Sequence, residues 1–211
     1  MPCSKHGKRS SFIPLTKPKI REHFRQACCI MTLPDRQKAA QTAATIFAKQ
    51  AFFKSCHHVA SYLPIRNEFD AMPLMEELWR AKKTCYLPVI ATDQEKTLHF
   101  VRYQHGDALH KNRYGVLEPI KHLAAISPAH LDIVITPLIA FDVQGHRLGT
   151  GGGFYDKTFS FLQQTRPRKP LMIGLGYAIQ QARSLPVDPW DVLLDGIVTE
   201  QQFIACRTIK I

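Results

Sequence analysis

The sequence predicts an α/β protein in which helices flank a largely parallel central sheet. Short apolar segments alternate along the chain with segments of helical period, which is typical of β-α-β units. One of them, LDIVITPLIAFD (131–142), is almost continuously apolar, as expected for a strand covered on both faces. A glycine-rich stretch follows it directly. We therefore predict a three-layer, Rossmann-like arrangement with N-terminal helices packed on it.

Composition limits the classes of function. The 211 residues are 45% hydrophobic, which suffices for a buried core. The formal net charge is +11, and the first 25 residues carry seven Lys or Arg against one Glu. Such a charge indicates polyanion partners, either nucleic acid or a phosphorylated or carboxylated small ligand. Because the sequence has no zinc-finger, helix-turn-helix or aromatic RNA-binding motif, we do not expect a nucleic-acid partner.

The surroundings of the protein can be predicted in the same way. No apolar run approaches the ~20 residues of a membrane span. The six cysteines show no CxxC spacing, which favours reduced thiols. We expect a cytoplasmic monomer with no membrane partner. Residues 1–16 are predicted to form a disordered basic tail, and residues 17–211 a single domain.

The first half of the domain is predicted to begin with two helices. Residues 17–30 repeat apolar side chains at helical spacing, and Thr32 is a candidate N-cap of a second helix that runs to about Lys54. A strand ending at Pro64 and a helix over 71–82 come next. Further strands are expected at 84–90, ending again in a Leu-Pro pair, and at 98–103.

The second half is predicted to contain the central strand 131–142, a helix over 155–164, and strands at 170–178 and 195–199. In open parallel sheets, ligands bind beyond the carboxyl ends of the strands. The glycine stretch and both Leu-Pro strand ends are expected to meet there.

The glycine stretch is GHRLGTGGGFYDK, residues 145–157. Consecutive glycines let backbone N–H groups point into one concavity that suits phosphate oxygens. Arg147 could add bidentate contacts, and Asp156 could hold Mg²⁺ that bridges phosphates. The spacing fits neither a Walker loop nor the dinucleotide fingerprint. A tight strand-to-helix turn that needs glycine for its geometry alone is the alternative.

Four segments together resemble the 5-formyltetrahydrofolate cyclo-ligases. The strongest is FDVQGHRLGTGGGFYDK, in which Phe154 stands where tyrosine is common in that family. The others, in order, are KPKIR (17–21), YLPIRNEFD (62–70) and PVDPWDVLLDGIVT (186–199). The resemblance covers residues 17 to about 200. It implies ATP- and Mg²⁺-dependent closure of 5-formyltetrahydrofolate, polyglutamylated or not, to 5,10-methenyltetrahydrofolate.

The resemblance also implies roles for single residues. Arg147, Lys17 and Tyr155 would be catalytic, Leu63 and Glu68 would bind the folate, and Asp156 and Asp191 would bind Mg²⁺. Tyr62, Phe154 and Tyr155 would supply walls of the site. The ATP-binding residues would be Lys17, Pro18, Lys19, Ile20, Arg21, Arg147, Leu148, Gly149, Thr150, Gly151, Gly152, Gly153, Phe154 and Tyr155.

Without the resemblance, plainer interpretations remain for these residues. Lys17 and Arg21 would form a solvated basic helix face, Glu68 would be a loop residue, and Asp188 a turn residue before Pro189. Two other functions stay open at this point: a relative that uses the nucleotide loop on another substrate, and a basic protein that binds nucleic acid without catalysis.

Overall fold

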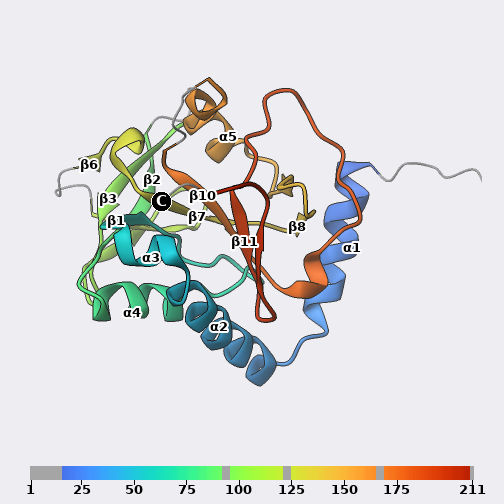
Figure 1. The fold of residues 1–211 in the computed structure, drawn as a ribbon, viewed down its shortest axis with the longest axis horizontal. Coiled ribbons are helices and arrows are strands. Elements are labelled where there is room, and N and C mark those ends of the chain that lie inside the picture. The colour runs from blue at the N-terminus through green and yellow to red at the C-terminus, as the bar shows by residue number, and fades with distance from the viewer. Residues whose placement is uncertain (1–15, 92–95, 121–124, 165–168, 210–211) are drawn as a thin grey trace, which may run out of the picture.

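The computed structural model describes residues 16–91, 96–120, 125–164 and 169–209. An eight-stranded sheet in the order β12-β11-β10-β7-β1-β2-β3-β6 forms its centre (Figure 1). The four pairings from β11 to β2 are parallel, and the pairings outside them are antiparallel. The predicted α/β class with a largely parallel centre is therefore confirmed. The strands of this sheet are β1 His58–Ala60, β2 Thr84–Ile90, β3 Leu98–Arg102, β6 Ala125–Ile126, β7 Ile133–Pro137, β10 Leu171–Leu175, β11 Gly196–Val198 and β12 Phe203–Ala205.

Helices cover both faces of the sheet. Figure 1 shows α2 (Leu33–Ala48), α3 (Ala51–Ser55) and α4 (Met72–Arg80) below it and α5 (Phe154–Thr158) above it. The lower core packs Phe47, Phe52 and Leu78 against the sheet. The upper core packs Phe159, together with Leu162 of the 3₁₀ turn η2 (Ser160–Gln163), against the opposite face. The three layers are thus held by two separate apolar clusters.

Helix α1 (Lys17–Cys29) stands beside the sheet rather than on either main face (Figure 1). Its buried Ile20 and Phe24 pack with Ile139, Leu148 and Leu185. Leu148 belongs to a two-stranded ribbon formed by β8 (Ala140–Phe141) and β9 (Arg147–Leu148), which leads directly into the glycine stretch. The apolar face of α1 therefore fixes the helix against the base of that loop. A second small ribbon pairs β4 (Leu109–Lys111) with β5 (Leu117–Pro119).

The prediction of one continuous strand over 131–142 was wrong. The chain forms β7, leaves the main sheet after Pro137, and pairs again as β8 with β9. The side-chain amide of Gln180 donates to the carbonyl oxygens of Leu138 and Ile139, at 3.1 Å each. Those carbonyls are satisfied without a neighbouring strand, so apolar composition alone did not reveal the break.

Both Leu-Pro pairs were also placed incorrectly. β1 ends at Ala60, before Leu63 and Pro64, while β2 continues through Pro88 to Ile90. Pro88 is tolerated inside a strand because β1 pairs only with Thr84–Tyr86 of β2 and needs no N–H at residue 88. Only the first pair therefore lies beyond a strand end.

The helices differ from prediction mainly in length. Thr32 is the N-cap of α2, and its hydroxyl accepts the amide N–H of Asp35 at 3.3 Å. The expected helix to Lys54 is interrupted by Gln50, whose backbone is extended, so α2 and α3 are separate. The expected helix over 155–164 is only α5 followed by η2.

The expectations for the termini and the surroundings are tested only in part. Residues 1–15, most of the predicted tail, lie outside the described residues, and Thr16 is the N-cap residue of α1. Cysteines 28, 29, 56, 85 and 206 are free thiols. Among the helices of the described residues, none combines the length and apolarity required to cross a membrane.

Gly145 fixes the turn between β8 and β9. Its φ is +92°, and a Cβ there would lie 2.7 Å from the carbonyl oxygen of Leu194. We expect Gly145→Ala to lower the free energy of unfolding by at least about 2 kcal/mol, since it adds a backbone clash to the strain of a positive φ. Gly106 has the same φ but no atom within 4 Å of such a Cβ. Chemical denaturation should therefore show a loss of only about 1 kcal/mol for Gly106→Ala. Equal losses would contradict the packing argument.

Candidate active site

Helix α1 presents two cations to the glycine stretch. Lys17 and Arg21 are one helical turn apart, on the side of α1 that remains partly open when Ile20 and Phe24 are buried. The Arg21 Nε–H donates to the carbonyl oxygen of Gly149 at 2.8 Å. Its guanidinium also lies against Gly151, where a Cβ would be 3.4 Å from Nη2. The first helix and the loop thus meet through one arginine.

The second cation, Lys17, is bound by two carboxylates. Its ammonium lies 2.6 Å from Asp188 Oδ2 and 3.1 Å from Asp191 Oδ2. The same Asp191 oxygen accepts the amide N–H of Asp188 at 2.9 Å, which closes the turn between them. Burial alone would lower the pKa of Lys17, but the hydrogen bonds and charges of the two aspartates outweigh it and raise that pKa. The ammonium therefore stays charged.

The backbone of the glycine stretch offers unpaired donors. Across the described ranges, the amide N–H groups of residues 149–153 take part in no hydrogen bond. Gly151 and Gly153 adopt φ of +105° and +72°, which side chains other than glycine rarely tolerate. α5, which follows, has only five residues, so the donors come from the loop itself rather than from a long helix. Such a run of free amides is suited to bind an anion.

Arg147 and Asp156 bind each other across the loop. One Arg147 nitrogen donates to Asp156 Oδ1 at 2.7 Å, and another donates to the carbonyl oxygen of Val192. Asp156 Oδ1 also accepts the amide N–H of Val192 at 3.0 Å. The Arg147 side chain is only 6% exposed. The pair joins the glycine loop to the segment that carries Asp188 and Asp191.

The predicted folate-binding segment lies next to the same loop. Glu68 Oε2 accepts the amide N–H of Ile65 at 3.0 Å. Burial raises the pKa of the Glu68 carboxyl, and the hydrogen bond from Ile65 opposes that shift in part. Burial also raises the pKa of Tyr155, with the negative charge of Glu68 adding to the shift and Arg147 opposing it. Tyr155 is therefore within electrostatic reach of both predicted subsites.

Aromatic rings line this junction. Tyr155 stacks on Phe159 with ring centroids 6.4 Å apart, and Phe154 lies against Gly152. Tyr62 is fully buried, and its hydroxyl donates to the carbonyl oxygen of Phe69 at 2.8 Å. Leu63 is half-buried at the rim of the lower core. Of the three aromatic residues predicted to line the site, Tyr62 is held by its hydrogen bond to Phe69, whereas Phe154 and Tyr155 directly follow the glycine loop.

Not every residue of the predicted ATP-binding set presents its side chain to this site. Ile20 and Leu148 are buried in the cluster that holds α1, so they position the cations rather than contact a ligand through their side chains. Pro18, Lys19 and Thr150 are exposed. Asp188 was interpreted only as a turn residue, and its bond to Lys17 was missed. The spacing of the two aspartates in DPWD, three residues apart across a turn, is the sequence feature that could have indicated a shared partner for Asp188 and Asp191.

The donor set fits a metal ion that arrives together with its ligand. No group of three or more His, Cys, Asp or Glu within the described residues could hold a metal by itself. Mg²⁺, however, commonly binds through one or two carboxylates and completes its shell with phosphates and water. Asp156 and Asp191, brought to one site through Val192 and the turn that precedes it, meet that requirement.

Comparison with known proteins identifies the family. A model of the 5-formyltetrahydrofolate cyclo-ligase family matches residues 15–200. The chain belongs to this family. It is therefore an enzyme, as the sequence resemblance predicted.

Individual relatives agree with this assignment. The 5-formyltetrahydrofolate cyclo-ligase of Escherichia coli (strain K12) is 39% identical over 177 residues, which cover 83% of this chain and 96% of the relative. The Haemophilus influenzae cyclo-ligase is 33% identical over 183 residues, 86% of this chain and 96% of the relative. The structure of Aquifex aeolicus 5,10-methenyltetrahydrofolate synthetase superimposes with a TM-score of 0.78 at 27% identity, covering 93% and 95% of the two chains.

The buried carboxyl of Glu68 gives a prediction in which stability and activity change in opposite directions. Its raised pKa means that the folded state binds more protons than the unfolded state as pH rises above the ordinary glutamate value. The free energy of unfolding therefore falls as pH rises from the ordinary pKa of a glutamate to the raised pKa of Glu68. Near neutral pH, the protein bears the full cost of burying the charged carboxylate. We expect Glu68→Gln to raise the melting temperature near neutral pH and to raise KM for 5-formyltetrahydrofolate at least about tenfold.

Below the ordinary pKa of a glutamate, the two proteins should melt at the same temperature, since both then carry a neutral side chain at residue 68. Calorimetry across pH and steady-state kinetics provide the two measurements. A variant that is less stable at neutral pH and unchanged in KM would show that Glu68 is only a loop residue.

Proposed function

We propose that this enzyme closes 5-formyltetrahydrofolate to 5,10-methenyltetrahydrofolate at the expense of Mg·ATP, releasing ADP and phosphate. The observation that carries the proposal is the combination of free amides at residues 149–153 with Arg21 bound to Gly149. A turn that used glycine for geometry alone would not require a cationic helix docked on it. The amides and the two α1 cations together supply the donors that a polyphosphate requires.

The need for ATP follows from the substrate. A formyl amide oxygen is a poor leaving group, so ring closure by direct attack is slow. Transfer of the γ-phosphoryl group to that oxygen breaks its bond to ADP and makes the formyl carbon electrophilic. N10 of the folate then bonds to this carbon, the C–O bond breaks with departure of phosphate, and the proton of N10 leaves with the phosphate. The protein is required to position these groups and to stabilise charge, and it needs no ionised nucleophile of its own.

Lys17 and Arg21 are assigned to the nucleotide phosphates, with the loop amides around them. Arg147 and Tyr155 are assigned to the reacting end of the site. Because the pKa of Tyr155 is raised by burial and by Glu68, its phenol remains protonated at neutral pH and can donate a hydrogen bond. Glu68 and Leu63 are assigned to the folate, where a carboxylate can accept N–H groups of the pterin edge.

Asp156 and Asp191 would hold Mg²⁺, which when bound supplies positive charge that offsets the phosphates. In this structure, Asp191 is bound to Lys17 and Asp156 to Arg147. We infer that nucleotide phosphates compete for the two cations, so that both carboxylates are freed for the metal. The ion pairs thus keep each group charged and oriented before the ligand binds.

Arg21 provides the most direct test through mutation. Mixing the enzyme, Mg·ATP and 5-formyltetrahydrofolate should produce the near-ultraviolet absorbance of 5,10-methenyltetrahydrofolate, and omission of ATP should abolish it. We expect Arg21→Ala to raise KM for ATP at least about tenfold, because a charge-assisted hydrogen bond is lost at the loop. KM for the folate should change much less.

Arg25 is the matched control, since it lies one turn further along α1 and is exposed. Arg25→Ala should leave both KM values within about twofold of the original. Product formation that does not depend on ATP would contradict the proposed reaction. Equal effects of the two arginine variants would contradict the assignment of Arg21.

A further inference from the structure

A second polar pocket lies away from the site described above. It has a volume of about 340 Å³ and is lined by Trp79, Lys82, Lys83, Thr84, Arg102, Gln104 and His105. Every one of these side chains can donate a hydrogen bond, and none is a carboxylate. Three of them carry a permanent positive charge. The lining therefore contains no carboxylate that could balance these positive charges.

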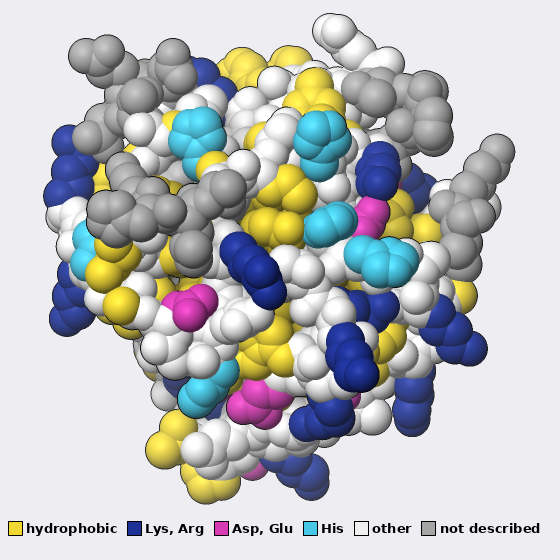
Figure 2. Space-filling view, turned by 90° about the vertical axis from the view of Figure 1, so that its left-hand side faces the viewer, with side chains coloured by type: hydrophobic (Ala, Val, Ile, Leu, Met, Phe, Trp, Pro, Cys, Tyr) yellow, Lys and Arg dark blue, Asp and Glu magenta, His cyan; other side chains and the backbone are white. Residues whose placement is uncertain are grey.

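The pocket is built by the end of one helix and the start of two paired strands. α4 ends in a turn in which the amide N–H groups of Lys82 and Lys83 donate to the carbonyl oxygens of Trp79 and Leu78, at 2.9 Å each. β2 begins at Thr84, and the antiparallel register that pairs Tyr86 with Arg102 brings Gln104 opposite Thr84. These elements lie on the left of Figure 1, and Figure 2 shows Lys, Arg and His side chains scattered over that face among apolar and other groups, with fewer acidic side chains.

The charges around the pocket are incompletely balanced. Lys83 is partly committed, because its ammonium donates to the carbonyl oxygen of Cys56 at 2.7 Å and lies 4.8 Å from the centre of the Phe53 ring. Lys82 and Arg102, both exposed, form no ion pair with any carboxylate of the described ranges. Asp107 accepts the amide N–H of Gln104 at 2.7 Å and is used in that turn.

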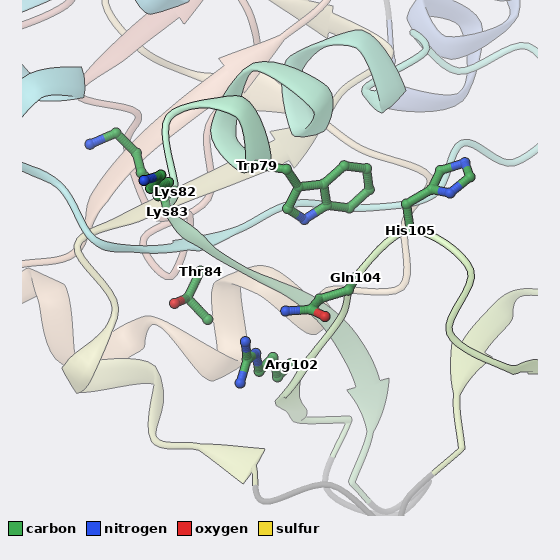
Figure 3. A pocket seen from close by; sticks show the side chains of 7 residues that line it. All are labelled: Trp79, Lys82, Lys83, Thr84, Arg102, Gln104 and His105. Carbon is green, nitrogen blue, oxygen red and sulfur yellow. The ribbon is translucent and has the colours of Figure 1, made fainter.

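An independent observation points to a missing acceptor. The indole Nε1 of Trp79 is buried and has no hydrogen-bond partner in the part of the chain that is described. Figure 3 shows the nitrogen edge of this ring turned toward the side of the pocket where Gln104, Thr84 and Arg102 lie. Buried N–H donors are normally satisfied, and each exception calls for a cause. Gln104 is exposed, and a change of its side-chain rotamer would let a ligand in the pocket reach this donor.

The pocket is separate from the catalytic machinery. Thr84 marks the amino end of β2, whereas Glu68 follows the carboxyl end of β1 and the glycine loop follows the β8–β9 ribbon. α4 also runs between the two regions, starting at Met72 shortly after Glu68 and ending beside the pocket. A ligand here would not occupy the ATP or folate positions.

We propose that this pocket is a binding site for a multivalent oxyanion, held by Arg102 and Lys82 and by the indole N–H of Trp79. Phosphate-type and carboxylate-type ligands share this chemistry, so the test uses both, with inorganic pyrophosphate as one probe and citrate as the other. Ionic strength is kept constant with potassium chloride because nonspecific attraction to a basic protein is screened by salt.

The two tryptophans of the chain make the test specific. Trp79 lies at the pocket, whereas Trp190 is exposed beside Asp191, so their indole N–H resonances report on different places. In ¹H–¹⁵N spectra of the full-length protein, either probe should shift the Trp79 resonance in a saturable manner. Trp79→Phe assigns the resonance. The stronger of the two probes identifies whether the ligand is of the phosphate or the carboxylate type.

Arg102→Gln should weaken the binding that the Trp79 resonance reports at least about tenfold, since it removes a charge-assisted donor. Arg25→Gln removes the same charge from an exposed position on α1 and should change the binding less than about twofold. The proposal is overturned if neither probe shifts the Trp79 resonance, if only the Trp190 resonance moves, or if the two arginine variants behave alike.

Discussion

The arrangement of the candidate active site depends on one buried junction between Arg147, Asp156 and Val192. The guanidinium of Arg147 binds both the Asp156 carboxylate and the Val192 carbonyl, and Asp156 in turn accepts the amide N–H of Val192. β9 and α5, at the two ends of the glycine loop, are joined there to the segment before β11, which is distant in sequence. Because the Arg147 side chain is almost completely shielded from water, these bonds are stronger than the same contacts would be on the surface. Because Arg147 and Asp156 fix the two ends of the glycine loop at this junction, the backbone between them can remain open to a ligand.

Charge balance explains how so many ionisable groups coexist at this site. Lys17 lies between Asp188 and Asp191, and Arg147 lies against Asp156. Each pair contains one member that suits a phosphate and one that suits a cation. Binding of a metal–nucleotide complex would therefore exchange partners rather than bring isolated charges out of water, and a site of this kind is organised before its ligand arrives. The packing of α1 through Ile20 and Phe24 places Lys17 and Arg21 beside the glycine loop and the aspartates, where this change of partners would take place.

The amino-acid pattern predicts the layers and the family, but not the contacts. The α/β class and the alternation of helices and strands follow from the periodicity of apolar residues, and the N-cap at Thr32 follows from the preference for hydroxyl side chains at helix starts. The break at Leu138 could not be predicted, since it depends on a side-chain amide of Gln180, more than forty residues away in the chain. The bond of Lys17 to Asp188 joins residues 171 positions apart, and no local pattern encodes it. For the same reason, the sequence indicated separate roles for Arg147 at the phosphates and for Asp156 at the metal, whereas the fold joins the two side chains in an ion pair.

In the proposed reaction, the formyl oxygen of the substrate is phosphorylated before the ring closes. The most direct measurement uses 5-formyltetrahydrofolate labelled with oxygen-18 in its formyl group and follows the label by mass spectrometry of the products. We expect the label to appear in the released inorganic phosphate, with one ADP formed for each methenyl product. Label found in water, with phosphate unlabelled, would mean that the oxygen leaves without ever bonding to phosphorus, and this would contradict the mechanism even if ATP were consumed.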